Sequence, residues 1–128
     1  MSNVDILKKG YQYFAEGNIE GVLSLFDPEI EWNECKGVPF IENEGTFIGH
    51  QSVVENIFAQ IPEHYDGFNI NIVDIFGSGD KVVMEGYHMG TWKTTGKKFK
   101  ANAAHIWTVI DGKATRFFQA VDTATIIS

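Results

Sequence analysis

The sequence predicts an α+β fold in which a curved antiparallel sheet wraps around three N-terminal helices to form a cone with an internal pocket. In the first half of the chain, apolar residues recur mainly at spacings of three and four, which is typical of amphipathic helices. From residue 68 onward the spacing changes to two, which indicates strands. Helices that precede the strands, rather than alternating with them, favour the α+β class.

Three helices are predicted in the N-terminal half. The first has an apolar stripe formed by Val4, Leu7, Tyr11 and Phe14. It ends at Gly17, and Asn18 can cap the second helix. The second stripe is formed by Ile19, Val22, Leu23 and Phe26. Asp27 ends that helix because the following proline disfavours helical backbone. The third stripe is formed by Val54, Ile57, Phe58 and Ile61, and we expect Pro62 to end it.

A short strand and a long loop are predicted between the second and third helices. In residues 29–34 the apolar Ile30 and Trp32 alternate with acidic or polar side chains, which indicates a strand with one wet face. Residues 35–49 are rich in Gly, Asn and Glu. We expect them to form a loop that could act as a flap.

Four strands are predicted to form a meander in the second half of the chain. The first starts at Phe68 and ends at the turn 77–80, and the others cover residues 82–92, 99–110 and 114–122. Gly86 and Gly90 interrupt the second of these strands. Glycine inside a strand predicts sharp bending or a close approach of another backbone segment.

The last two strands are joined by Asp111-Gly112, which is a strong hairpin signal and predicts a register. If these two residues form the turn, Ile110 pairs with Lys113 and His105 faces Phe118. Alternation then assigns one face to His105, Trp107, Arg116, Phe118, Ala120 and Asp122. Alanines beside titratable and aromatic side chains leave room, so this face is predicted to line a pocket. In this register His105 and Asp122 lie roughly 13 Å apart, too far for a direct hydrogen bond.

Composition and charge narrow the function classes. The 128 residues are the length of one domain, which we expect to span residues 1–128. The net charge is −7 and no cluster of basic residues exceeds a pair such as Lys97-Lys98, which argues against binding to nucleic acid or to an anionic membrane surface. Cys35 is the single cysteine, so no disulfide can form within the chain. With no apparent signal sequence or membrane-spanning run, a cytoplasmic location is expected.

Several segments together resemble a known superfamily. They are residues 14–26, Ile30-Glu31-Trp32, Gly45 to Gly49 before a helix, and the stretch from Asp111 to Asp122. In this order they resemble the nuclear transport factor 2-like superfamily, and within it the SnoaL-like polyketide cyclases and ketosteroid isomerase-related proteins. The resemblance implies a cone-shaped domain that binds a small molecule, and it implies homodimerisation. It does not fix the reaction, because this fold hosts both enzymes and binding proteins.

The resemblance implies three catalytic candidates. Glu34 matches the position of the general base of the isomerases, and His105 matches the acid that donates a hydrogen bond to the substrate oxygen. Asp122 resembles an acidic residue on the last strand of the cyclases. The tyrosine donor of the isomerases falls on Gly10, so that donor is expected to be missing here.

Each candidate also has a purely structural interpretation. Glu34 could be an exposed glutamate of an acidic strand, and His105 could be a core histidine bonded to a backbone carbonyl. Asp122 could cap the C-terminal tail. The other predicted pocket residues are Trp32, Tyr87, His88, Trp107 and Phe118. No ligand spacing supports a metal site, and neither a metal nor a cofactor is expected.

Two functions follow from these residues. In the first, the protein binds a small hydrophobic carbonyl compound and acts as a cofactor-free isomerase or cyclase. Glu34 or Asp122 removes a proton next to the carbonyl, and His105 stabilises the oxygen. In the alternative, the same pocket binds its ligand without converting it.

Overall fold

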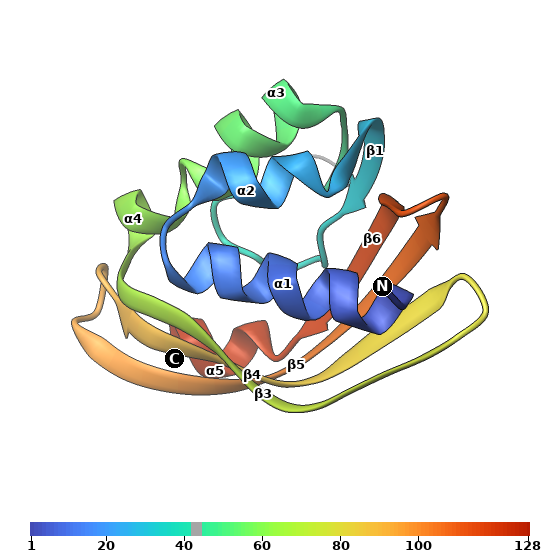
Figure 1. Ribbon diagram of the computed structural model, residues 1–128. Helices are drawn as coiled ribbons and strands as arrows, with labels where there is room; N and C mark the ends of the chain where they lie inside the picture. Colours follow the sequence, from blue (N-terminus) through green and yellow to red (C-terminus); the bar gives the residue numbers. More distant parts are fainter. Residues whose placement is uncertain (42–44) are drawn as a thin grey trace.

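A curved sheet of six strands wraps around the helices in the computed structural model, which describes residues 1–41 and 45–128 (Figure 1). The elements in chain order are α1 (Asn3–Ala15), α2 (Ile19–Ser24), β1 (Phe26–Asn33), β2 (Thr46–Ile48), α3 (His50–Val53), the π-helical turn η1 (Val54–Phe58), α4 (Ile61–His64), β3 (Tyr65–Ser78), β4 (Lys81–Trp92), β5 (Lys97–Ile110), β6 (Lys113–Val121) and α5 (Thr123–Ile127). The predicted α+β class is confirmed.

The helices differ from the prediction mainly at their ends. Asn18 caps α2 by accepting a hydrogen bond from the backbone of Gly21, as its position suggested. Phe26 begins β1 and does not belong to α2. The third predicted helix is divided into α3, η1 and α4. Pro62 lies in the first turn of α4, where the missing N–H of proline costs no helical hydrogen bond, so the expectation that it ends a helix is wrong.

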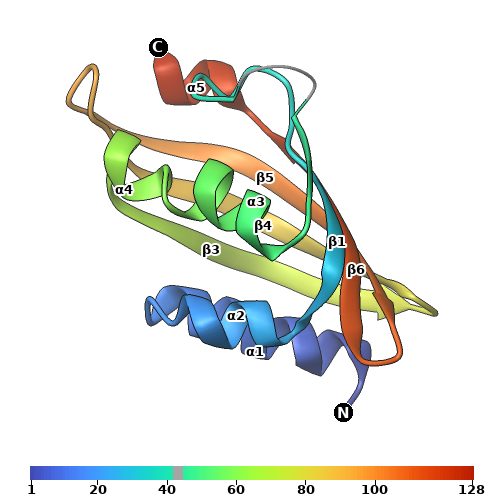
Figure 2. The same ribbon diagram turned by 90° about the horizontal axis from the view of Figure 1, so that it is seen from above.

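The sheet has the strand order β2-β1-β6-β5-β4-β3. All neighbours are antiparallel except β1 and β6, which run parallel, so the sheet is mixed rather than wholly antiparallel. β2 lies inside the segment that was expected to be a loop, and residues 42–44 of that segment lie outside the described residues. Figure 2 shows β1 and β6 side by side.

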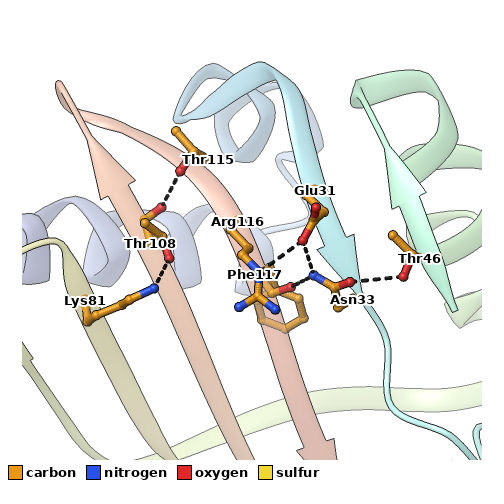
Figure 3. Close-up of polar contacts among 8 residues, drawn as sticks. All are labelled: Glu31, Asn33, Thr46, Lys81, Thr108, Thr115, Arg116 and Phe117. Carbon is orange, nitrogen blue, oxygen red and sulfur yellow. Dashed lines mark hydrogen bonds and ion pairs between the residues drawn. The ribbon is translucent and has the colours of Figure 1, made fainter.

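Polar side chains on the outer face stabilise the pairing of β1 with its neighbours (Figure 3). The Asn33 amide donates to the carbonyl oxygen of Phe117 at 3.1 Å, and the Arg116 guanidinium lies 3.0 Å from a carboxylate oxygen of Glu31. Thr46 on β2 donates to the amide oxygen of Asn33. The amide of Asn33 and the charge of Arg116 together hold the pKa of Glu31 below its ordinary value.

Gly86 allows the sheet to bend over the helices. The pairing of β3 with β4 shifts register between Ile72 and Asp74, opposite Gly86. A Cβ atom at position 86 would lie 2.1 Å from the carbonyl oxygen of Asn71, so only glycine fits this close approach. Figure 1 shows the long strands curving beneath α1. The prediction that glycine marks a bend or close approach in this strand is confirmed at Gly86.

The β5–β6 hairpin has the predicted turn but a different register. Ile110 pairs with Lys113, and both turn residues have positive φ. Thr115 then forms a bulge, and its hydroxyl donates to the carbonyl oxygen of Thr108 at 3.3 Å (Figure 3). Beyond this bulge the partner of His105 is Gln119, so the expected pairing with Phe118 is wrong by one residue.

The main core lies between the helices and the concave face of the sheet. It includes Phe26, Ile30, Trp32, Val82, Trp107, Val109 and Phe117, all buried. A second cluster, with Tyr65, Trp92, Phe99 and Ile126, lies at the end of the sheet next to α4 and α5. Within residues 1–41 and 45–128, none of the helices combines the length and apolar character required to cross a membrane.

Candidate functional site

A cavity lies between α1, α2 and the concave face of the sheet. The cavity volume is about 90 Å³. This is room for several water molecules, since one needs roughly 10–15 Å³. Its polar or amphipathic lining residues are Tyr11, Trp32, Glu34, Tyr65, His88, His105, Trp107 and Gln119. The other lining residues described are apolar or glycine, and none is Lys or Arg. The cavity therefore favours an uncharged, largely apolar ligand.

Glu34 brings the only carboxyl group among the described lining residues. It follows β1 directly, and its backbone N–H donates to the carbonyl oxygen of Gly45 at 2.8 Å. The side chain is only 8% exposed, and the indole N–H of Trp32 donates to one carboxylate oxygen at 2.7 Å. Burial raises the pKa of Glu34 to about 7, against the lowering effect of that hydrogen bond. Glu34 is thus not an exposed glutamate, and near pH 7 it can both accept and donate a proton.

On another part of the cavity wall, four side chains form a continuous hydrogen-bonded chain. The indole N–H of Trp107 donates to the hydroxyl oxygen of Tyr11 at 2.9 Å. The same hydroxyl lies 2.7 Å from Nδ1 of His105, and Nε2 of His105 lies 2.9 Å from Nε2 of His88. Because both nitrogens of His105 bond to side chains, this histidine is not the core residue bonded to a backbone carbonyl that was considered from the sequence.

The two histidines meet although they lie far apart along their strands. His105 pairs with Met84, and His88 lies four residues further along β4, roughly 13 Å away at ordinary strand spacing. Gly86 and Ala103, which pair with each other between them, add almost no side-chain bulk. The concave bend of the sheet then lets the two imidazoles reach one another above these small residues. The prediction that alanines leave room beside His105 is confirmed at Ala103.

Burial keeps the whole chain of groups uncharged near pH 7. It lowers the pKa of His88 to about 4. The pKa of His105 is also lowered, by burial first and by the neighbouring His88 second. Burial raises the pKa of the Tyr11 hydroxyl above its ordinary value. Neutral imidazoles and a protonated phenol can donate hydrogen bonds and relay protons, but they cannot neutralise an anionic ligand.

Three sequence-predicted site residues do not reach the cavity. Asp122 is exposed and caps α5, where it accepts hydrogen bonds from the backbone and the hydroxyl of Thr125, so the structure does not place this predicted base in the cavity. Phe118 is 41% exposed on the outer face because the bulge reverses its side. Tyr87 alternates with the inward-facing His88, and its ring lies under the ammonium of Lys100. The predicted pocket roles of Phe118 and Tyr87 are therefore wrong.

Among the polar or amphipathic cavity residues, the sequence reasoning missed Tyr11, Tyr65 and Gln119. Tyr11 belongs to the apolar stripe of α1, lies one residue beyond Gly10 and lines the cavity, where its hydroxyl bonds to His105. Gln119 was assigned to the outer face by the predicted register. Its side chain is in fact only 6% exposed, lines the cavity, and has no hydrogen-bond partner among the described residues. The tyrosine in the stripe was a usable signal, whereas the bulge that turns Gln119 inward was not.

No metal-binding cluster is present in the part of the chain that the structure describes. Within it, no three His, Cys, Asp or Glu side chains converge as metal ligands would. Cys35 is half-buried and unpaired, and burial and the nearby Glu34 raise the pKa of its thiol. A thiol held protonated in this way is a poor nucleophile.

Comparisons with known proteins agree with this architecture. The family model of the SnoaL-like domain matches residues 7–117. An NTF2-like protein from Burkholderia thailandensis is 29% identical, with a TM-score of 0.90 over 98% of this chain and 95% of that one. TerC, co-crystallised with polyporic acid, is 30% identical, with a TM-score of 0.85 over 98% of both chains. An NTF2-like protein of unknown function from Burkholderia pseudomallei is 26% identical, with a TM-score of 0.87 over the whole of both chains. No curated protein matches.

Proposed function

Because the chain belongs to the SnoaL-like domain family, we propose that it binds a small, uncharged aromatic carbonyl compound and moves protons on it without a cofactor. One observation carries the proposal. Glu34 is a lone carboxyl group buried in a cavity of aromatic and aliphatic side chains, which also holds the neutral donors of His88 and Gln119. A buried base in the same cavity as hydrogen-bond donors supplies the groups that proton abstraction next to a carbonyl requires.

The lining and one relative support an aromatic ligand. Aromatic rings of Phe14, Phe26, Phe58, Phe68 and Phe117 line the cavity together with Trp32 and Trp107. Flat apolar surfaces of this kind favour stacked or edge-to-face contacts with another ring. The 30%-identical TerC was co-crystallised with polyporic acid, which is an aryl-substituted hydroxyquinone. The ligand proposed for this chain shares the aromatic rings and carbonyl oxygens of that compound but carries no acidic hydroxyl group.

The proposed reaction is a proton transfer. The Glu34 carboxylate removes a proton from the carbon next to the carbonyl, and the electron pair of the broken C–H bond moves onto the carbonyl oxygen. His88 and Gln119 donate hydrogen bonds to this oxygen. Where the ligand also has a C=C bond conjugated with the enolate, the protonated Glu34 returns the proton to the far carbon of that bond, the double bond shifts and the carbonyl re-forms, which gives an isomer. Where the ligand has a second carbonyl, the enolate carbon attacks it and the proton goes to the new alkoxide, which gives a ring.

Exchange of carbon-bound protons in wild-type protein tests the proposal. We expect the protein to bind 2-tetralone, and we expect this binding to quench the fluorescence of Trp32 and Trp107. In D₂O the protein is expected to accelerate the incorporation of deuterium next to the carbonyl of 2-tetralone. Tetralin, which lacks the oxygen, is the matched control ligand. Binding without accelerated exchange across a panel of aryl ketones would contradict catalysis and favour the non-catalytic binding module. Absence of both would contradict the proposed ligand class.

We also propose that the protein is a homodimer that associates through the outer face of the sheet. Four apolar residues pair in a row across the strands on that face, namely Phe76, Val83, Ile106 and Phe118. Phe76 is 52% exposed, and such a contiguous apolar row on a surface is typical of an interface. Light scattering after size exclusion is expected to give twice the mass of one chain for the wild-type protein. The Ile106→Asp variant is expected to give the mass of a single chain. A wild-type monomer at high concentration would contradict the proposal.

A further inference from the structure

We infer that Tyr11 and Trp107 are positioning residues that hold His88 in the tautomer with its proton on Nδ1, so that His88 donates a hydrogen bond to the oxygen of a bound ligand. The ligand in this inference rests on the proposed function. The tautomer is a property of the protein alone, and it can be tested without any ligand.

The direction of the hydrogen bonds is set at Trp107. An indole N–H can only donate, so the Tyr11 oxygen accepts from it. The hydroxyl proton of Tyr11 then needs an acceptor, and its other partner among the described residues is Nδ1 of His105. Nδ1 of His105 therefore accepts. In a neutral imidazole the second nitrogen must then carry the proton, which places it on Nε2 of His105.

The order of donor and acceptor at His105 also determines the protonation of His88. Nε2 of His105 donates to Nε2 of His88 across 2.9 Å, so Nε2 of His88 is the acceptor and Nδ1 carries the proton. Every fully buried side-chain nitrogen and oxygen of the described residues has a hydrogen-bond partner. Nδ1 of His88 has none among these residues, so this nitrogen is not fully buried, and His88 lines the cavity. The chain of bonds thus ends in an N–H group available to a ligand oxygen.

The opposite direction would leave a proton without a partner. If His105 donated from Nδ1, the Tyr11 oxygen would accept from both Trp107 and His105, and its own proton would have no acceptor among the described residues. An unsatisfied buried hydroxyl proton is costly. The indole of Trp107 therefore determines a tautomer three side chains away, although Trp107 and His88 form no hydrogen bond with each other.

Nitrogen-15 NMR of the histidine side chains tests the inference in the ligand-free protein at pH 7. We expect the proton of His105 on Nε2 and that of His88 on Nδ1, the less common tautomer in water. His50 provides an internal reference, because its Nε2 lies 3.1 Å from the carbonyl oxygens of both Phe26 and Asp27 and must carry the proton. A His88 proton on Nε2 in the wild-type protein would overturn the inference.

Two variants separate positioning from folding. Tyr11→Phe removes the donor to His105, so both tautomers of His105 and His88 are expected to be populated, and the affinity for 2-tetralone to fall relative to tetralin. Tyr13→Phe is the matched control on the same helix, since the Tyr13 hydroxyl has no hydrogen-bond partner among the described residues. Trp107→Phe, which leaves Tyr11 in place, is expected to give the same mixture and serves if Tyr11→Phe does not fold.

The outcomes distinguish this inference from the proposed function. Unchanged tautomers in both Tyr11→Phe and Trp107→Phe, or an equal change in Tyr13→Phe, would overturn the positioning role. A correct tautomer with no binding of any aryl ketone would support the hydrogen-bond chain and contradict the proposed ligand class. A shift of the His88 Nδ1–H proton resonance on adding 2-tetralone, absent with tetralin, is expected if both are correct.

Discussion

Replacing Glu34 with glutamine is expected to slow the exchange of 2-tetralone protons by about 10²- to 10⁴-fold, the usual contribution of a general base. Glutamine keeps the shape of the side chain and can still accept the indole hydrogen bond of Trp32, but it cannot take up a proton at neutral pH. Binding of 2-tetralone, measured by tryptophan fluorescence, is expected to persist.

The pH dependence of the wild-type reaction follows from the pKa of Glu34. The carboxylate is the active form of a base, so the exchange rate is expected to rise with pH and to level off above the pKa of about 7. His88, whose burial lowers its pKa to about 4, is neutral over this range and adds no second transition. A rate that falls through pH 7, after correction for the uncatalysed exchange, would contradict a role for Glu34 as the base.

Glu29→Gln is the matched control for this variant. Glu29 lies on β1, close to Glu34 in sequence, but it is exposed and does not line the cavity. The same chemical change at position 29 is expected to leave the exchange rate unchanged. Equal losses in the two variants would show that the effect is not specific to the cavity.

We expect measurements of the stability of Glu34→Gln to show that unfolding of this variant is not the cause of its slower exchange. The pKa of Glu34 is raised from 4.5 to about 7 in the folded protein, so its contribution to stability is complete below pH 4.5 and is lost as the pH rises through 7. Glutamine has no such loss. The free energy of unfolding of Glu34→Gln relative to wild type is therefore expected to increase by about 3 kcal/mol between pH 4.5 and pH values above 7. Urea unfolding at several pH values measures this difference.

The order of elements was predictable from the sequence because apolar periodicity reports which face of each element is buried. Short elements were missed. β2 has three residues and α5 has five, too few for a period to be recognised. The burial of Glu34 was also hidden, because the residues before it alternate as they would in any strand with one wet face. Its surroundings include Gly45 and Tyr65, which are distant in the sequence.

The candidate site was only partly predictable because the bulge in β6 reverses which of the side chains that follow it point toward the cavity. The Asp111-Gly112 turn predicts the first pair correctly, and nothing in the residues that follow signals that Thr115 is extra. With two phenylalanines in succession, either could face inward. The hydrophobic pattern therefore permits both registers, and the polar Gln119 argues against the one that forms.

Phe117→Ala is expected to lower the free energy of unfolding by about 3–5 kcal/mol, the usual cost of truncating a buried phenylalanine. Phe117 is 1% exposed, and its ring centroid lies 3.9 Å from that of Trp32 and 4.4 Å from that of Trp107. It also contacts the ring of His105 edge to face at 5.0 Å. Alanine would remove this contact surface from the base of the cavity, where rigid strands cannot close the gap.

The neighbouring variant Phe118→Ala makes the same chemical change on the opposite face of β6. It tests whether the loss of stability depends on the side to which the phenylalanine points. Phe118 is 41% exposed on the outer face, and its ring lies near the guanidinium of Arg116. In the monomeric protein, its truncation is expected to change the free energy of unfolding by less than about 1 kcal/mol, as surface substitutions usually do. Urea unfolding of both variants in the same oligomeric state gives the comparison. Without the bulge at Thr115 the order of the two effects would be reversed, because Phe118 would then face the core, so the larger loss identifies the register of β6.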